Sequence, residues 1–268
     1  KGIDPETGAD IQRAVEDMKV KYPQSKLRSV TTMRSPGDAP ASTYPVGGGP
    51  GGVLTGESDI RLNSAEMGSK GKGSWHEWIT DELKRDPRAI AHHANNTVEY
   101  ELGLHEFGHT LAFTGANRDA VVAQVDPTLR KLYRDLHPDM TKVDIKEFNA
   151  WKREQLSDYS FETWSKLNKD EALAEAFASV ESNPKKATKA EHALHDLLVK
   201  SSLQEQKTSK PLPGAWAITK PADVVSAKEA KRAAAQAKKE ADAAEKAAAK
   251  AAAKAEKELA DELARVRD

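Results

Sequence analysis

The chain has 268 residues, of which 38% are hydrophobic and 6% aromatic, a composition that supports one hydrophobic core with an extension. Its net charge of -1 provides no overall attraction to nucleic acid or to an anionic membrane, so neither is expected as a partner. Because cysteine is absent, disulfides are excluded, and histidine and carboxylate side chains are the expected ligands of any bound metal.

The N-terminal part of the chain is predicted to form one helix and a small β-sheet. Residues 5–21 place apolar side chains on one helical face, and residues 27–33 alternate in the manner of a strand. Residues 35–52 are rich in proline and glycine and are predicted to form a loop at the rim of a cleft. Two short strands are expected within 53–63. The last segment, 60–63, is interpreted either as an ordinary strand or as a free edge for pairing with an extended peptide.

A helix that carries a metal-binding motif is predicted in the middle of the chain. The motif is His105-Glu106-Phe107-Gly108-His109, whose two histidines lie one turn apart on one helical face. This spacing suits two nitrogen ligands of one Zn²⁺ ion, with Glu106 as general base toward a water molecule. The alternative is a surface helix with two histidines. Apolar neighbours favour a buried position: Val98, Leu102, Leu104, Phe107, Leu111, Ala112 and Phe113.

Four further helices are predicted from apolar periodicity, over residues 75–85, 119–136, 142–156 and 189–203. Pro127 is expected to divide the second of them into two helices, because proline favours the first position of a helix. The last of them contains His192 and His195. These two histidines are interpreted as surface residues, since no third ligand lies near them in the sequence.

A third metal ligand is predicted on another helix. Residues 170–178 are strong helix formers, and Glu171 and Glu175 lie one turn apart on one face. Two solvated carboxylates are one interpretation of this pair. The upstream histidines favour a zinc ligand, which we assign to Glu171, with Glu175 hydrogen-bonded to a ligand imidazole. The reverse assignment of the two glutamates is the main alternative.

The C-terminal part of the chain is predicted to lie outside the folded domain. Residues 206–224 contain three prolines and are interpreted as a linker. Residues 225–268 are rich in alanine, lysine and glutamate, which favour a helix through intrinsic propensity and charge pairs four residues apart. The segment has no heptad pattern of leucine or isoleucine, so it is predicted to be a solvated helix that connects to a larger polypeptide or assembly.

Two motifs of the chain are arranged as in a known family: His105-Glu106-Phe107-Gly108-His109, then Glu171-x-x-x-Glu175-Ala176-Phe177. They resemble those of gluzincin metallopeptidases of the anthrax lethal factor type, which include phage head-associated and toxin-associated polypeptides. The resemblance covers about the middle third of the chain and implies that Glu171 completes a zinc site. The family places an oxyanion-stabilising tyrosine seven residues before this ligand, where the chain has Trp164. Tyr159 is therefore expected in that role, with the indole N–H of Trp164 as the alternative.

These observations predict an α+β protein with a zincin-like metallopeptidase domain over 1–205, mostly helical with a small N-terminal sheet. A linker over 206–224 and a long solvated helix over 225–268 follow. The expected function is that of a zinc-dependent endopeptidase, with Glu106 as general base and a protein or peptide as substrate. The alternative is a catalytically weak or inactive zincin-like structural or delivery component of a phage or toxin polypeptide.

The sequence contains no signal peptide and no apolar run of membrane-spanning length. Because Lys1 rather than methionine begins the chain, we expect a processed chain or an excerpt of a longer polypeptide. The cytoplasm, a virion and secretion by a route without a signal peptide all stay open as localisations.

Overall fold

The computed structural model describes residues 2–36, 39–47, 54–68, 96–114 and 118–204. The chain divides into two units, Lys1–Leu212 and Pro213–Asp268, and the second unit lies outside the described residues. The predicted helix 75–85, the predicted linker 206–224 and the predicted helix 225–268 also lie outside them. The described residues contain helices and a small sheet, so the predicted α+β class is confirmed. Within these residues, no helix combines the length and the apolar character needed to cross a membrane.

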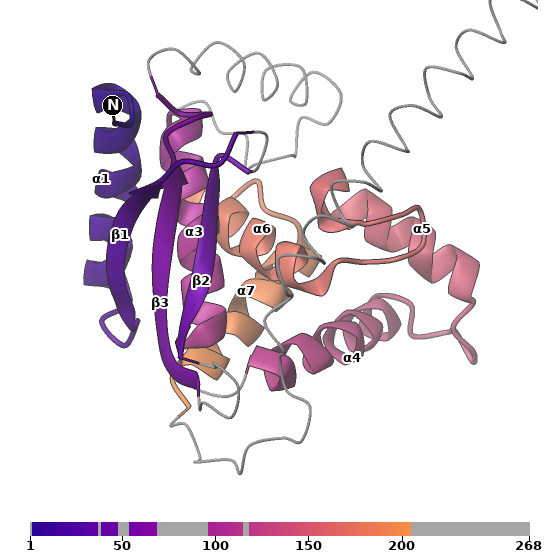
Figure 1. Cartoon of the computed structure of the whole chain (residues 1–268). Helices are drawn as coiled ribbons and strands as arrows, with labels where there is room; N and C mark the ends of the chain where they lie inside the picture. The colour runs from indigo at the N-terminus through magenta and orange to yellow at the C-terminus, as the bar shows by residue number, and fades with distance from the viewer. Residues whose placement is uncertain (1, 37–38, 48–53, 69–95, 115–117, 205–268) are drawn as a thin grey trace, which may run out of the picture. The chain divides into compact units, whose positions relative to one another are not determined.

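The sheet consists of β1 (Leu27–Met33), β2 (Ala41–Gly47) and β3 (Leu54–Asn63), in the order β1-β3-β2. The central strand β3 pairs parallel with β1 and antiparallel with β2 (Figure 1). Strand β1 has the bounds that its alternation predicts. Strand β3 replaces the two short strands predicted within 53–63, since Gly56 takes a φ of 77° and lets one strand pass through the segment between them.

The arrangement of the strands corrects one prediction and decides another. Residues 41–47 lie in the predicted loop but form β2, because Thr43 and Tyr44 are β-prone and Pro45 is tolerated on an outer strand. The prediction of a loop throughout 35–52 is therefore wrong. Residues 60–63 belong to the central strand, which is paired on both sides, so they form an ordinary strand and not a free edge.

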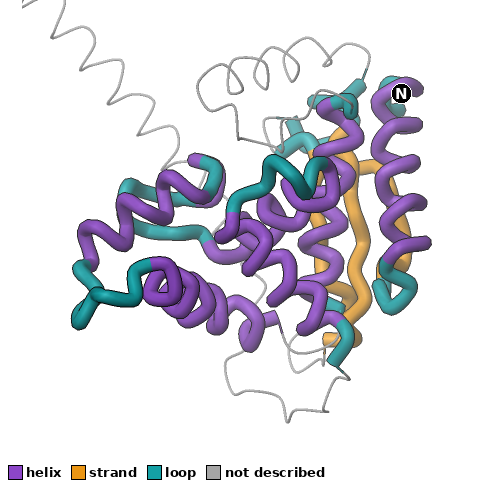
Figure 2. Tube along the Cα trace, turned by 180° about the vertical axis from the view of Figure 1, so that it is seen from behind, coloured by secondary structure: helices purple, strands orange, loops and turns teal. Residues whose placement is uncertain are grey.

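The helices among the described residues are α1 (Pro5–Lys21), α3 (Val98–Phe113), α4 (Arg118–Leu136), α5 (Ile145–Gln155), α6 (Lys169–Ser182) and α7 (Lys189–Ser202), with a 3₁₀ turn η1 (Asp158–Ser160). Helix α3 lies at the centre and contacts α1, β2, β3, α6 and α7. The sheet lies in front of α3 in Figure 1, and the helices lie in front of the strands in the reverse view of Figure 2. Phe107 and Leu111 of α3 are fully buried, so the predicted apolar surroundings of the motif do form core.

Helix α4 continues through Pro127 and is not divided there. Proline has no backbone N–H and removes one intrahelical hydrogen bond, which is the reason to expect a break. Val121, Val125 and Leu129 nevertheless form a continuous buried stripe along both halves of the helix. Packing of this stripe outweighs the local preference, because most helical stability in proteins comes from tertiary contacts. The prediction of two separate helices is therefore wrong.

The surface interpretation of His195 is also wrong. The side chain of His195 is only 12% exposed, and its Nε2 lies 2.8 Å from Glu181 Oε1. The same oxygen accepts a hydrogen bond from the Tyr22 hydroxyl at 2.5 Å, and Lys21 Nζ lies 2.5 Å from the other oxygen of Glu181. These contacts tie the C-terminal end of α1 to α6 and α7. His192 on the same helix is only partly buried.

Two glycines of α3 allow neighbouring helices to approach its backbone. A Cβ atom on Gly103 would lie 2.7 Å from the Cβ of Ala14 in α1. A Cβ atom on Gly108 would lie 2.9 Å from the Cα of Ala174 and 3.2 Å from the Cβ of Phe177, both in α6. Any larger residue at these positions requires the facing helix to move. Gly108 therefore sets the separation between α3 and α6.

We expect Gly108→Ala to push α6 away from α3 and Gly103→Ala to push α1 away. Each substitution should lower the free energy of unfolding by about 1–2 kcal/mol, because overpacking outweighs the gain in helix propensity. Urea unfolding measures this loss. The zinc site that the sequence predicts distinguishes the two variants: Gly108→Ala should weaken zinc binding by at least about tenfold, the scale of changes just outside a metal site, whereas Gly103→Ala should leave it near that of the parent. Equal zinc affinities in the two variants would contradict the role given to Gly108.

Candidate metal centre

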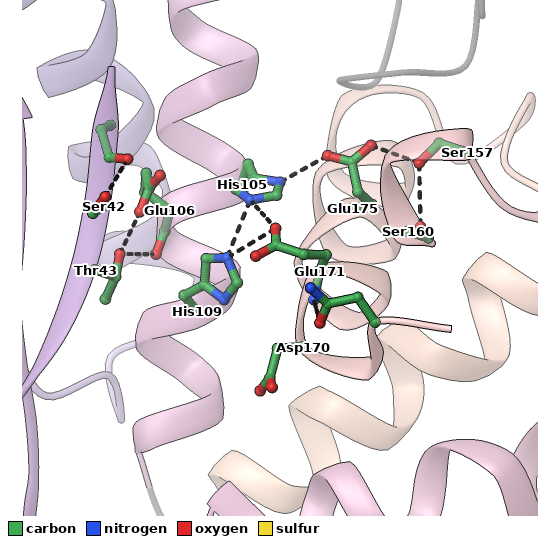
Figure 3. Close-up of polar contacts among 12 residues, drawn as sticks. Ser42, Thr43, His105, Glu106, His109, Ser157, Ser160, Asp170, Glu171 and Glu175 are labelled. Carbon is green, nitrogen blue, oxygen red and sulfur yellow. Dashed lines mark hydrogen bonds and ion pairs between the residues drawn. The ribbon is translucent and has the colours of Figure 1, made fainter. Parts of the chain in front are cut away.

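Helix α3 carries the two histidines and the glutamate of the motif. His105 and Glu106 are buried, and His109 is partly buried. One helical turn separates the histidines, and their Nε2 atoms lie 3.1 Å apart. Figure 3 shows both rings on the side of α3 that faces α6, with Glu106 on the side that faces β2.

Helix α6 brings Glu171 to the two histidines. The Asn168 side chain caps this helix and accepts a hydrogen bond from the N–H of Glu171, which places Glu171 in the first turn. Glu171 Oε2 lies 3.2 Å from His105 Nε2 and 3.5 Å from His109 Nε2. Within the described part of the chain, His105, His109 and Glu171 form a group that could hold a metal ion.

The separations of the three atoms fit a tetrahedral zinc site. Zinc–ligand bonds of about 2.0–2.1 Å at tetrahedral angles require neighbouring ligand atoms about 3.3–3.4 Å apart. The observed separations of 3.1, 3.2 and 3.5 Å lie on both sides of this value. Glu171 Oε2 is buried and accepts no hydrogen bond, although both imidazole nitrogens lie within ion-pair distance of it. A buried carboxylate oxygen without a partner is costly, and a cation between the three atoms would remove that cost.

Glu175 lies on the far side of the His105 ring. Its Oε1 is 2.7 Å from His105 Nδ1, and both groups are buried. A carboxylate accepts a hydrogen bond from an N–H at this nitrogen, so the contact favours the tautomer in which the lone pair of Nε2 faces His109 and Glu171. Glu171 therefore faces the Nε2 atoms of both histidines, and Glu175 faces Nδ1 of His105. Their roles as metal ligand and as partner of a ligand imidazole stay predictions.

Two serines continue this contact away from His105. Ser157 Oγ donates a hydrogen bond to Glu175 Oε2 at 2.8 Å, and Ser160 Oγ lies 3.2 Å from Ser157 Oγ. Both serines are buried (Figure 3). Ser157 precedes the turn η1, which contains Tyr159 and ends at Ser160. Sequence reasoning missed them, because a serine in a connecting segment carries no pattern that indicates its partner.

The carboxylates make this part of the interior favour positive charge. Burial by itself would lower the pKa of His105, but the carboxylates of Glu171 and Glu175 outweigh burial and raise this pKa well above its ordinary value. Burial by itself would raise the pKa of Glu171, but His105 and His109 hold that pKa below its usual range. Glu171 therefore stays ionised, as a metal ligand must be.

The structure separates the two candidates for oxyanion stabilisation. Tyr159 is 40% exposed, and its ring lies at 71° to that of His105 with the ring centroids 5.8 Å apart. Desolvation and the nearby charges of Glu171, Glu175 and Glu106 raise the pKa of the Tyr159 hydroxyl, which therefore remains a hydrogen-bond donor. Trp164 is 74% exposed and lies against Arg153, whose guanidinium is 5.2 Å from its ring centroid. The structure thus brings Tyr159 to the ligand cluster and leaves Trp164 at the surface.

Strand β2 contributes a contact that the sequence did not indicate. Thr43 Oγ1 lies 2.6 Å from Glu106 Oε2 and 3.0 Å from the backbone oxygen of Glu106. The β-prone residues Thr43, Tyr44 and Val46 were a signal for a strand, but the surrounding prolines and glycines obscured it. Without that strand, no sequence argument placed Thr43 beside the motif.

Comparisons with family models, with curated proteins and with solved structures found no match to this chain. The chemistry of the site is therefore argued from its own residues.

We expect Glu171→Ala to abolish zinc binding, because it removes one of three ligand atoms. Glu175→Gln should weaken binding by about 10–100-fold, the usual effect of changing the partner of a ligand imidazole. Metal analysis after dialysis and competition with a chromophoric chelator measure both effects. Glu162→Gln, which changes an exposed glutamate, serves as the control and should bind like the parent. Retention of zinc by Glu171→Ala together with its loss in Glu175→Ala would reverse the two roles.

Proposed function

We propose that this chain is a zinc-dependent endopeptidase of the gluzincin type and that its α+β domain is zincin-like. The observation that carries the proposal is the convergence of His105 Nε2, His109 Nε2 and Glu171 Oε2 at separations of 3.1–3.5 Å, with the buried Glu106 on the helix that carries both histidines. Two imidazoles and one carboxylate form a ligand set that leaves a fourth zinc position free for chemistry.

Each residue of the site has a defined task in peptide hydrolysis. His105, His109 and Glu171 would hold the ion, and Glu175 keeps His105 in the ligand tautomer. When bound, Zn²⁺ supplies Lewis acidity, which polarises a peptide carbonyl and makes water easier to deprotonate. Glu106 accepts a proton from the attacking water and later delivers it to the nitrogen of the departing amine as the C–N bond breaks.

Tyr159 is the proposed donor to the oxygen that becomes negatively charged during attack. Its ring lies against His105, and desolvation together with nearby carboxylates raises the pKa of its hydroxyl and keeps it protonated. The hydrogen bond from a donor at that position to the substrate oxygen is stronger in the transition state than in the ground state, which is the requirement for catalysis. The indole of Trp164 is the alternative donor, but its 74% exposure gives it less support.

The substrate is proposed to be an extended peptide alongside β2. This strand has a neighbour on one side only in the described sheet, and its residue Thr43 reaches the motif. An extended peptide adds to such a strand through backbone hydrogen bonds. Pro45 has no N–H to donate, so we expect the peptide to pair with the residues of β2 before and after Pro45 and not with Pro45 itself.

We expect the full chain to bind zinc and to cleave members of a mixed peptide library. Glu106→Gln should keep its zinc and lose about 10²–10⁴-fold in kcat, because it removes the proton acceptor and none of the ligands. Metal analysis and mass spectrometry of the library measure the two effects separately, and a chelator should abolish cleavage by the parent. Unchanged turnover in Glu106→Gln would refute the assigned base. Stoichiometric zinc without cleavage of any peptide would support the alternative, a zincin-like structural or delivery component without activity.

Tyr159→Phe and Trp164→Phe test the two oxyanion candidates against each other. Tyr159→Phe should lower kcat by about 10²–10³-fold with little change in KM, because it removes only the hydroxyl donor. Trp164→Phe should remain within about twofold of the parent, since an exposed aromatic change has small effects. Steady-state kinetics on one cleaved peptide measure both variants. The opposite result would move the role to Trp164.

A further inference from the structure

We infer that Thr43 is a positioning residue for Glu106 and that its hydroxyl couples the outer strand β2 to the general base. The inference rests on the proposed peptidase function for its catalytic meaning. Its structural part, a bond from strand to base, stands on the contacts of the described residues.

Strand register directs the Thr43 side chain at α3. Thr43 pairs with Ile60 of β3, and side chains directly opposite in a sheet share one face. Ile60 is fully buried, so this face is the one toward the helices. The next residue, Tyr44, points to the other face, where the guanidinium of Arg61 lies 4.5 Å from its ring centroid. A shift of one residue in register would turn Thr43 away from Glu106.

The Thr43 hydroxyl has two acceptors, and both belong to Glu106. Its Oγ1 lies 2.6 Å from the carboxylate Oε2 and 3.0 Å from the backbone oxygen (Figure 3). A carboxylate and a carbonyl only accept, so Thr43 must be the donor. Glu106 is 4% exposed, and a buried carboxylate needs such a donor to offset its loss of water. Donation to Oε2 fixes the carboxylate and leaves its second oxygen to meet the proton of a water molecule.

The second acceptor ties the same hydroxyl to the main chain of α3. Thr43 Oγ1 lies within hydrogen-bond distance of both the carboxylate and the backbone oxygen of Glu106, so one side chain of β2 holds both parts of that residue. Thr43 therefore limits the movement of the Glu106 carboxylate relative to its own helix.

Thr43→Val tests this role, because valine keeps the shape and the strand preference of threonine and removes only the hydroxyl. We expect unchanged zinc content, a KM within about twofold of the parent and a kcat lower by about 10–100-fold, the value of one hydrogen bond to a charged group. Thr43→Ser, which restores the donor, should return kcat to within about threefold. Thr32→Val makes the same change at an exposed position of β1 and should leave both constants unchanged.

A second measurement does not depend on activity. Urea unfolding of the metal-free full chain is compared for the parent, Thr43→Val, Glu106→Leu and the double variant. In the parent, Thr43→Val should lower the unfolding midpoint. In the Glu106→Leu background the same substitution should lower the midpoint by less than about half as much, because the carboxylate that needs the donor is then gone. Non-additivity of this kind supports the coupling of Thr43 to Glu106.

The outcomes separate this inference from the proposed function. Additive changes in the unfolding midpoint would overturn the role of Thr43 even if the parent is an active peptidase. Unchanged or faster turnover by Thr43→Val would do the same. A parent that cleaves no peptide while its midpoints are non-additive would overturn the peptidase function alone. In that case the bond between β2 and Glu106 remains established as a structural coupling.

Discussion

The candidate site depends on the close approach of two helices at one glycine. Gly108 lies between the two histidines of the motif, and the Cα of Ala174 in α6 lies only 2.9 Å from where a Cβ atom of Gly108 would be. A glutamate side chain has a fixed reach, so the separation of the helix axes decides whether Glu171 meets both imidazoles. Packing at protein density transmits a change of even one methyl group to its neighbours. The absence of a side chain at this position therefore allows the close helix packing in which the three ligand atoms converge.

The motif is also held from both sides by buried polar contacts. On the helical side, Ser157 donates to Glu175, and Glu175 holds the ring of His105. On the sheet side, Thr43 donates to Glu106. Buried polar groups require partners, and each of these partners also fixes the direction of a side chain that does chemistry in the proposed mechanism. Stability and geometry of the site thus have the same physical origin.

The comparison of sequence and structure shows where local rules succeed. Helical periodicity placed His105 and His109 on one face and Glu171 and Glu175 on one face, because both relations lie within a single turn. Local rules failed for Pro127, where a buried stripe on α4 overrides the cost of a missing hydrogen bond. They failed again for His195, whose carboxylate partner is on another helix.

The amino-acid sequence by itself determined the α+β class, the bounds of β1 and the presence of two helices with ligand-type residues one turn apart. Only the tertiary structure decided that strand β2 forms in a segment rich in proline and glycine, that Tyr159 rather than Trp164 approaches the histidines, and that Thr43 reaches Glu106. The physical reason is the range of the interactions. Backbone periodicity acts over a few residues and depends only on the residues of one segment. A hydrogen bond between a strand and a distant helix, in contrast, exists only after packing has brought the two together.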